Sequence, residues 1–84
     1  MLCVARVSGK TDDDAHLLRL GRSIRALRKE QGLSQEAMAH AAQIDRSHMG
    51  KIERGERNVT FLNLKRIASA LECSIADVLT HAGL

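Results

Sequence analysis

The chain contains no proline, tryptophan or tyrosine, and Phe61 is its one aromatic residue. With 84 residues and so few large side chains, it can form one domain with only a modest core. Ala, Leu and Arg are the most plentiful residues, whereas Val and Ile are less common. This composition favours helices, and short helices joined by short loops are the expected architecture.

Cysteine is equally rare, because only Cys3 and Cys73 occur. They form no CxxC motif and have no neighbouring His pair, which argues against a zinc site. Cys73 is instead expected to be a small buried apolar residue. Neither a Ser/His/Asp set nor a phosphate loop is present, so we expect no enzyme activity, no metal and no cofactor. The histidines are scattered along the chain and are expected at the surface: His16, His40, His48 and His81.

The chain also lacks an apolar run of about 18 residues and a signal-peptide core, so we expect a cytoplasmic protein without a membrane segment. Charge is unevenly distributed. Residues 15–70 hold eleven Lys and Arg against five Asp and Glu, although the whole chain carries a net charge of +3. A basic middle suggests a polyanionic partner, and a solvated basic face explains the same charge equally well.

The first residues differ from the rest. Residues 1–13 are expected to be a tail, because chain termini are usually loose, with a short strand or an arm that adds to a partner chain as the alternatives. Asp12–Asp14 suit the positive end of the following helix. Residues 14–84 then form the domain.

Hydrophobic periodicity predicts five helices, over residues 14–31, 35–42, 46–54, 61–71 and 75–81. Gly32 is expected to close the first helix, and the later helices have good N-caps in Ser34, Asp45, Thr60 and Ser74. The residues expected to face the core are Leu17, Leu20, Ile24, Leu27, Gln31, Met38, Ala39, Ala42, Met49, Ile52, Glu53, Phe61, Leu64, Ile67, Ala68, Leu71, Ile75, Val78 and Leu79.

The second and third helices, with the tight turn between them, have the spacing of a helix-turn-helix. Ala39 is expected where the two helices cross, and Ile44 and Met49 fill the angle between them. The exposed face of the third helix carries no acid, with Gly50 beside its polar residues. Such a face suits the major groove, which is rich in hydrogen-bond acceptors. Its residues are Arg46, Ser47, His48, Lys51 and Arg54.

Residues 20–79 resemble the Cro/C1-type (XRE-like) helix-turn-helix family of bacterial and phage repressors. The matching stretches are LGRSIRALRKEQGLSQEAMA, DRSHMGKIERGERNVT and LKRIASALECSIADVL. The second stretch is especially similar to restriction–modification controller proteins and their stand-alone repressor relatives. The resemblance implies an all-α, compact five-helix lambda-repressor-like DNA-binding domain.

The resemblance also implies roles for individual residues. It implies base contacts from Arg46, Ser47 and Lys51, although Arg46 would contact only phosphate in the alternative interpretation. It implies an internal salt bridge between Arg28 and Glu53 that joins the first helix to the third. Contacts with the DNA backbone, or mixed contacts, are implied for Gln35, His48, Arg54, Arg57 and Asn58.

Three positions depart from what the family or a helix would favour. Gln43 stands where the family commonly has the glycine of the turn, and a left-handed backbone there would cost about 1–2 kcal/mol. Glu72 replaces a common glycine after the fourth helix. Gly50 lies inside the third helix and weakens it by about 1 kcal/mol relative to Ala.

One recognition helix covers only a few base pairs, so we expect a homodimeric transcriptional regulator on a pseudo-palindromic operator. No ligand pocket is recognisable, and no small-molecule effector is expected. The expected location is the bacterial or phage-infected cytoplasm, in association with the nucleoid. The expected dimer interface consists of Ile75, Val78, Leu79 and Leu84.

The alternative function is an antitoxin of similar fold, which binds a toxin partner and represses its own operon. A neighbouring toxin gene would favour the antitoxin, whereas neighbouring restriction–modification genes would favour a controller protein.

Overall fold

The computed structural model describes residues 15–84, which form five α-helices and no strand within that range. In chain order they are α1 (His16–Glu30), α2 (Gln35–Ala42), α3 (Arg46–Glu53), α4 (Phe61–Ala70) and α5 (Ile75–His81). The predicted all-α class and the five helices are confirmed. The tail predicted for residues 1–13, and the predicted role of Asp12–Asp14, lie outside the described residues.

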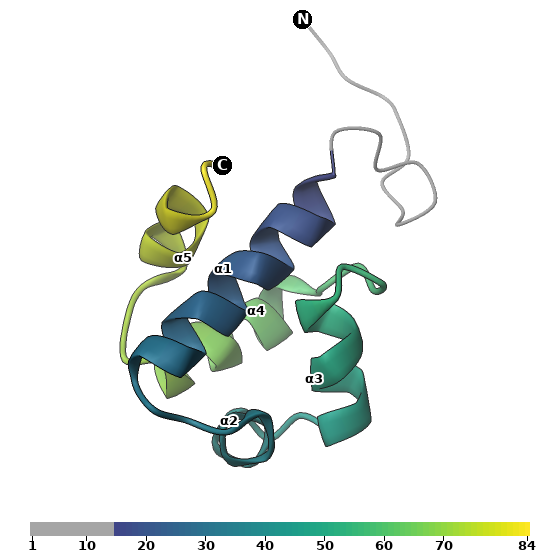
Figure 1. Cartoon of the computed structure of the whole chain (residues 1–84), viewed down its shortest axis with the longest axis vertical. Coiled ribbons are helices and arrows are strands. Elements are labelled where there is room, and N and C mark those ends of the chain that lie inside the picture. Colours follow the sequence, from purple (N-terminus) through teal and green to yellow (C-terminus); the bar gives the residue numbers. More distant parts are fainter. Residues whose placement is uncertain (1–14) are drawn as a thin grey trace, which may run out of the picture.

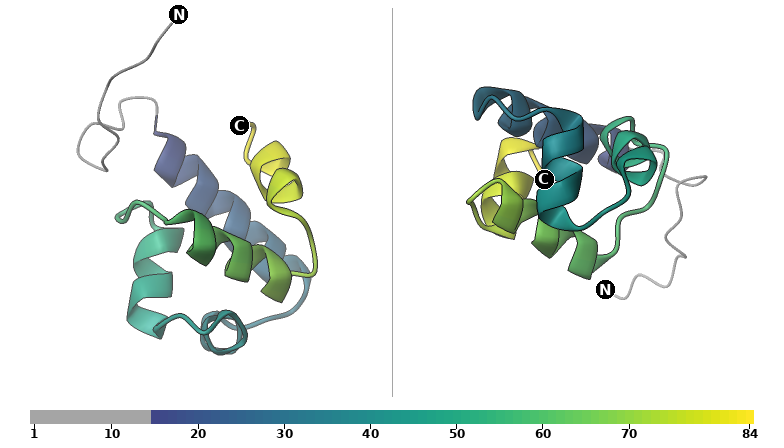
Figure 2. Two further views of the ribbon diagram at one scale, coloured as in Figure 1. Left: turned by 180° about the vertical axis from the view of Figure 1, so that it is seen from behind. Right: turned by 90° about the horizontal axis from the view of Figure 1, so that it is seen from below.

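The helices enclose one core. α1 packs against α3 on one side and α5 on the other, α2 packs against α3 and α4, and α4 packs against α5, so the contacts form a closed ring (Figure 1). α4 crosses the back of the molecule, which faces the viewer in the left panel of Figure 2. Every helix, or the residue that ends it, contributes at least one fully buried side chain, namely Ile24, Met38, Met49, Ile52, Ile67, Leu71 and Val78.

All four predicted N-caps are present. The side chains of Ser34, Thr60 and Ser74 each accept a hydrogen bond from the backbone N–H three residues later, and Asp45 accepts one from the N–H of Ser47. Asp77 also accepts from the N–H of Ser74, which completes a capping box. These hydrogen bonds hold the pKa of the Asp77 carboxyl below its usual range. Local polar residues therefore set where these four helices begin.

Some positions predicted to face the core do not lie there as expected. Phe61 is 67% exposed, so its prediction as a core residue is wrong. Phe61 is the first residue of α4. Periodicity shows which face of a helix is apolar, but it does not show whether a neighbouring helix extends far enough to cover the first turn of that helix. Gln31 is exposed and its amide donates to the carbonyl of Leu71, which ties the end of α1 to the end of α4. Cys73, expected to be buried, is half-buried and packs against the core.

Val78 corrects the predicted dimer interface. Its side chain is fully buried in the core of its own chain, so it is not available to a second subunit. The hydroxyl of Ser23 donates to the carbonyl of Val78 at 2.9 Å, and the guanidinium of Arg19 donates to the carbonyl of Gly83 at 3.1 Å. These bonds dock α5 on α1 and turn Val78 inward, while Ile75 and Leu79 remain half-buried.

Gln43 and Glu72, which stand where the family commonly has glycine, both adopt the left-handed backbone conformation. Gln43 ends α2 with φ 58° and ψ 41°, and Glu72 follows α4 with φ 57°. After Gln43, the N–H of Ile44 bonds to the carbonyl of Ala39 at 2.9 Å, the hydrogen bond of a helix end that reverses through a left-handed residue. The turn of the helix-turn-helix thus keeps its usual geometry without glycine.

Replacing Gln43 with glycine is expected to raise the free energy of unfolding by about 0.5–1 kcal/mol, because relief of the left-handed strain outweighs the added entropy of the unfolded chain. Urea denaturation measures the change. Gln43→Ala is the matched control and should bring no gain, because alanine has the same strain. A loss of stability in Gln43→Gly would show that the glutamine side chain contributes contacts that matter more than its backbone strain.

Candidate nucleic-acid interface

The angle between α2 and α3 is fixed by small and flexible side chains. Ala39 is 2% exposed, Ile44 is 8% exposed and Met49 is fully buried, as the sequence predicted for the residues between these helices. An alanine lets the helices approach closely, and a methionine adapts to the space that remains. Because one face of α3 is held in the core, the opposite face is turned outward.

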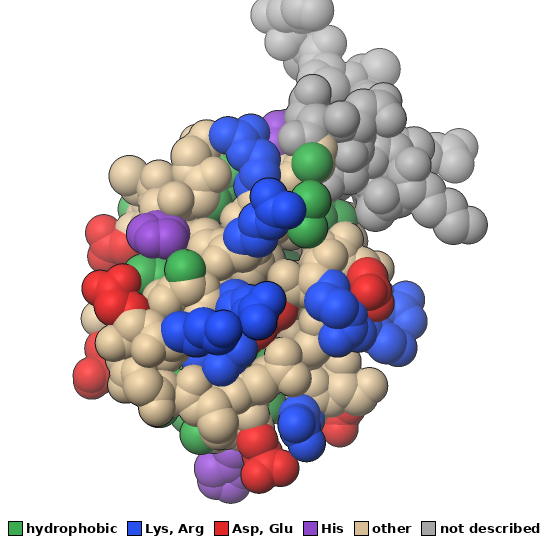
Figure 3. All heavy atoms as spheres, in the orientation of Figure 1, with side chains coloured by type: hydrophobic (Ala, Val, Ile, Leu, Met, Phe, Trp, Pro, Cys, Tyr) green, Lys and Arg blue, Asp and Glu red, His purple; other side chains and the backbone are tan. Residues whose placement is uncertain are grey.

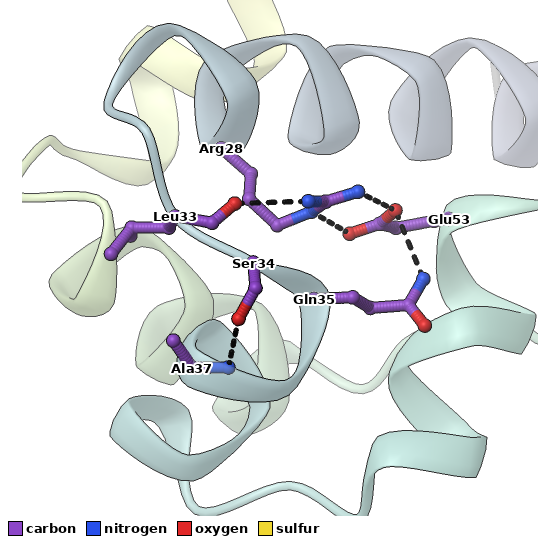
Figure 4. Close-up of polar contacts among 6 residues, drawn as sticks. All are labelled: Arg28, Leu33, Ser34, Gln35, Ala37 and Glu53. Carbon is purple, nitrogen blue, oxygen red and sulfur yellow. Dashed lines mark hydrogen bonds and ion pairs between the residues drawn. The ribbon is translucent and has the colours of Figure 1, made fainter.

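A buried ion pair joins α1 to α3. The Nε of Arg28 donates to Glu53 Oε2 at 2.8 Å, and its Nη2 donates to Oε1 at 3.0 Å, with both side chains less than one-tenth exposed. Arg28 Nη1 also donates to the carbonyl of Leu33 at 3.0 Å (Figure 4). The acid in α3 is therefore turned away from the outer face and neutralised within the fold.

Gln35, at the start of α2, completes this cluster. Its Nε2 donates to Glu53 Oε1 at 3.2 Å, so the carboxylate receives hydrogen bonds from α1 and from α2 (Figure 4). Its neighbour Ser34 caps the same helix through the N–H of Ala37. Gln35, which is predicted to contact the DNA backbone, is thus held in position by its hydrogen bond to the Arg28–Glu53 pair.

Two glycines allow α1 and α3 to approach closely. A Cβ at Gly21 would lie 2.5 Å from the carbonyl oxygens of both Ile52 and Glu53. A Cβ at Gly55, where φ is 74°, would lie 2.7 Å from the Cα of Leu18. Gly21 is not among the predicted packing residues, although a glycine in mid-helix is the available sequence signal, since it is unfavourable there without a packing reason.

Most predicted contact residues lie at the surface of α3 and the segment after it. Arg46, Ser47 and Arg54 are exposed, and so are Arg57 and Asn58, while His48 and Lys51 are half-buried. Lys and Arg side chains gather over α1 and α3 in the view of Figure 3. Part of the positive charge expected from the sequence therefore lies on the face that carries α3.

The structure also brings Arg25 to this face. A cavity of about 270 Å³ is lined by Arg25 of α1, Gln35 of α2 and Arg54 at the end of α3, with the buried ion pair at its base. Gly50 is buried beneath Gln35 and Arg54, since a Cβ there would lie 3.4 Å from Gln35 Oε1 and 3.1 Å from Arg54 Nη1. Gly50 thus makes room for these side chains and is not open at the outer face.

Two exposed ion pairs involve predicted contact residues. Arg46 Nη1 lies 3.8 Å from Glu36 Oε2, and Arg54 Nε donates to Glu56 Oε2 at 2.8 Å. The hydrogen bond to Glu56 raises the pKa of Arg54, and the same bond lowers the pKa of Glu56. Exposed pairs of this kind contribute little to stability, so both arginines can exchange partners when another anion approaches.

The described residues offer little to other kinds of site. Residues 15–84 contain no group of three His, Cys, Asp or Glu side chains that could hold a metal ion. None of the five helices is long and apolar enough to cross a membrane. Burial and the nearby Asp77 carboxylate raise the pKa of the Cys73 thiol, so this thiol is protonated at neutral pH.

Comparison with known proteins agrees with this geometry. A family model described as "Helix-turn-helix" matches residues 24–78. Control protein C.SmaI of Serratia marcescens is 40% identical over 65 residues, which cover 77% of both chains. The restriction–modification controller protein C.AhdI of Aeromonas hydrophila has a similar crystal structure, with 41% identity, a TM-score of 0.75 and coverage of 76% of this chain and 97% of its own.

Control protein C.MunI of Mycoplasma sp. is 37% identical over 62 residues, which cover 73% of this chain and 84% of its own. The residues matched by the family model include α2, α3 and the segment between α3 and α4. All of the predicted contact residues, from Gln35 to Asn58, therefore lie within the matched part.

Proposed function

Because the chain belongs to the Cro/C1-type (XRE-like) helix-turn-helix family, we propose that it is a DNA-binding transcriptional regulator of the restriction–modification control type. It acts as a homodimer on a pseudo-palindromic operator, with α3 in the major groove. The observation that carries this proposal is the orientation of α3. Its inner face is held by Met49, Ile52 and the Arg28–Glu53 pair, and its outer face presents exposed polar and basic residues.

The N-terminal part of α3 makes the base contacts in this proposal. Arg46 and Ser47 open the helix and are exposed, and Lys51 follows one turn later. An arginine can donate two hydrogen bonds to guanine O6 and N7, a contact worth about 1–3 kcal/mol of discrimination. The pairing with Glu36 at 3.8 Å is long and exposed, which leaves the guanidinium available for a base.

The surrounding residues set the position of α3 by contacting the sugar–phosphate backbone. Gln35 approaches from the start of α2, and Arg54 and Arg25 line the same cavity. Such contacts carry affinity but little sequence information. The further residues of this group are His48, Arg57 and Asn58.

In this proposal the dimer forms through α5 and the C-terminal residue, which do not contact DNA. Ile75 and Leu79 are half-buried on α5, and Leu84 is 47% exposed. Two subunits double the contacts and place two recognition helices in half-sites about one helical turn apart. Selection of bound sequences from random DNA tests both points: a symmetric consensus is expected, and a single unrepeated half-site would contradict the dimer.

Arg46→Ala is expected to reduce discrimination among operator variants, with a loss of about 1–3 kcal/mol at the base pair that Arg46 contacts. Binding titrations against a set of single-base operator variants measure this. Arg57→Ala is the matched control, because loss of a phosphate contact should weaken binding to all sequences and reduce the salt slope by about 0.9. If Arg46→Ala distinguished operator variants as well as the wild type, Arg46 would not contact bases.

A further inference from the structure

Glu56 is an exposed acidic residue beside the proposed DNA contact Arg54. Its carboxylate accepts two hydrogen bonds from Arg54, from Nε at 2.8 Å and from Nη2 at 3.3 Å. Both side chains are about half exposed, at 57% for Arg54 and 53% for Glu56. In Figure 3 an acidic side chain lies among Lys and Arg side chains over the C-terminal end of α3.

The backbone of Glu56 is fixed. Its N–H donates to the carbonyl of Lys51 at 2.9 Å, and the N–H of Gly55 donates to the carbonyl of Ile52 at 3.0 Å. Gly55, which precedes Glu56 and has a left-handed backbone, is packed on the backbone of Leu18. The carboxylate therefore extends from a rigid turn and does not depend on a mobile loop for its position.

The charges around Glu56 are those proposed to contact DNA. Arg54 hydrogen-bonds to it, and the positive charges of Lys51 and Arg57 add to the lowering of its pKa, so it is ionised at neutral pH. A carboxylate and a phosphate present similar pairs of oxygens to an arginine fork. The carboxylate of Glu56 thus accepts hydrogen bonds from Nε and Nη2 of Arg54, as a phosphate group would.

We propose that Glu56 is a built-in competitor of DNA for Arg54, which keeps binding to all DNA sequences weaker than the basic surface would otherwise make it. The proposal rests on the proposed function. When DNA arrives, Arg54 exchanges the carboxylate for a backbone phosphate, and the released carboxylate lies beside the polyanion. Because neither event depends on the base sequence, Glu56 lowers affinity for operator and non-operator DNA alike.

Glu56→Gln is the variant that tests the proposal, because glutamine keeps the shape of the side chain and removes its charge. Binding of double-stranded operator and of random duplex DNA is measured from about 50 to 200 mM salt. We expect affinity for both to rise roughly three- to ten-fold at low salt and the ratio between them to stay unchanged.

Glu72→Gln is the matched control, since it changes the net charge equally at an exposed site. Glu72 lies in the segment between α4 and α5, which is on the opposite side of the molecule from α3 (Figures 1 and 2). It should raise the affinity less than two-fold. Equal effects of Glu56→Gln and Glu72→Gln would mean that only net charge matters, and would overturn the proposal.

A double-mutant cycle tests the partner. In an Arg54→Ala background, Glu56→Gln should have a smaller effect, because the competition for Arg54 is gone and only the repulsion between the carboxylate and DNA remains. An undiminished effect in that background would overturn the competition with Arg54. Failure of the wild type to bind any duplex would overturn the proposed function and this inference together. Operator binding that is unaltered by Glu56→Gln would overturn this inference alone.

Discussion

Glu53→Ala is expected to lose about 3–5 kcal/mol of its free energy of unfolding, because it leaves the buried guanidinium of Arg28 without its carboxylate. Arg28 is 8% exposed, and two of its three hydrogen-bonding nitrogens donate to Glu53. A small domain has only about 5–15 kcal/mol of stability, so this loss is a large fraction of the total. Urea denaturation followed by circular dichroism measures the loss.

Glu56→Ala is the matched control, because it also removes a carboxylate that accepts two hydrogen bonds from an arginine, but at the surface. Its denaturation midpoint should stay within error of the wild type. If Glu53→Ala does not fold, the double variant Arg28→Met/Glu53→Leu should fold again, because apolar residues of similar volume replace a buried pair well. A Glu53→Ala variant as stable as Glu56→Ala would contradict the structural role of the pair.

Gly21→Ala is expected to destabilise the fold by about 1–3 kcal/mol, although alanine is the better helix former. Its Cβ would lie 2.5 Å from two backbone carbonyl oxygens of α3, and backbone atoms cannot rotate away as a side chain can. α3 must therefore shift away from α1. Because α3 carries the proposed base contacts, operator affinity should fall with stability even though Gly21 touches no DNA in the proposed complex.

The matched control for this substitution is Gly50→Ala, in the middle of α3. Its Cβ would meet only the flexible ends of Arg54, at 3.1 Å, and Gln35, at 3.4 Å. These ends can move by a few tenths of an ångström, so the gain in helix propensity of about 1 kcal/mol should appear as equal or greater stability. Thermal denaturation of both variants gives the comparison, and a Gly21→Ala protein as stable as Gly50→Ala would disprove the close approach of α1 and α3.

The helix-turn-helix family is established by the match over residues 24–78, and the five helices agree with it. Within the predicted dimer interface the structure already removes Val78, whose side chain is fully buried in its own chain.

The Arg28–Glu53 pair illustrates what the family resemblance added. Periodicity alone placed Glu53 on the inner face of its helix, where an acid is unfavourable, and only the resemblance gave it a partner. The structure contains the pair and adds Gln35, which donates to the same carboxylate from a third helix. Residues 25 positions apart in the chain meet only when the helices pack, so no local pattern indicates such a contact.

The sequence by itself determined what depends on neighbours in the chain. The N-caps at Ser34, Thr60 and Ser74 were predictable because each hydrogen bond spans three residues, and the helix-forming composition favoured the all-α class. The inward faces of the helices followed from their 3.6-residue period, as Ile24 and Ile67 illustrate.

Only the tertiary structure decided what depends on distant elements. Phe61 and Val78 both fitted an inward face, but one is exposed and the other is fully buried, because burial requires a neighbouring helix that reaches the position. Gly21 became important through the backbone of Ile52 and Glu53 in α3, which lie more than thirty residues away in the sequence. Periodicity gives the direction in which a side chain points, and packing alone determines what it meets there.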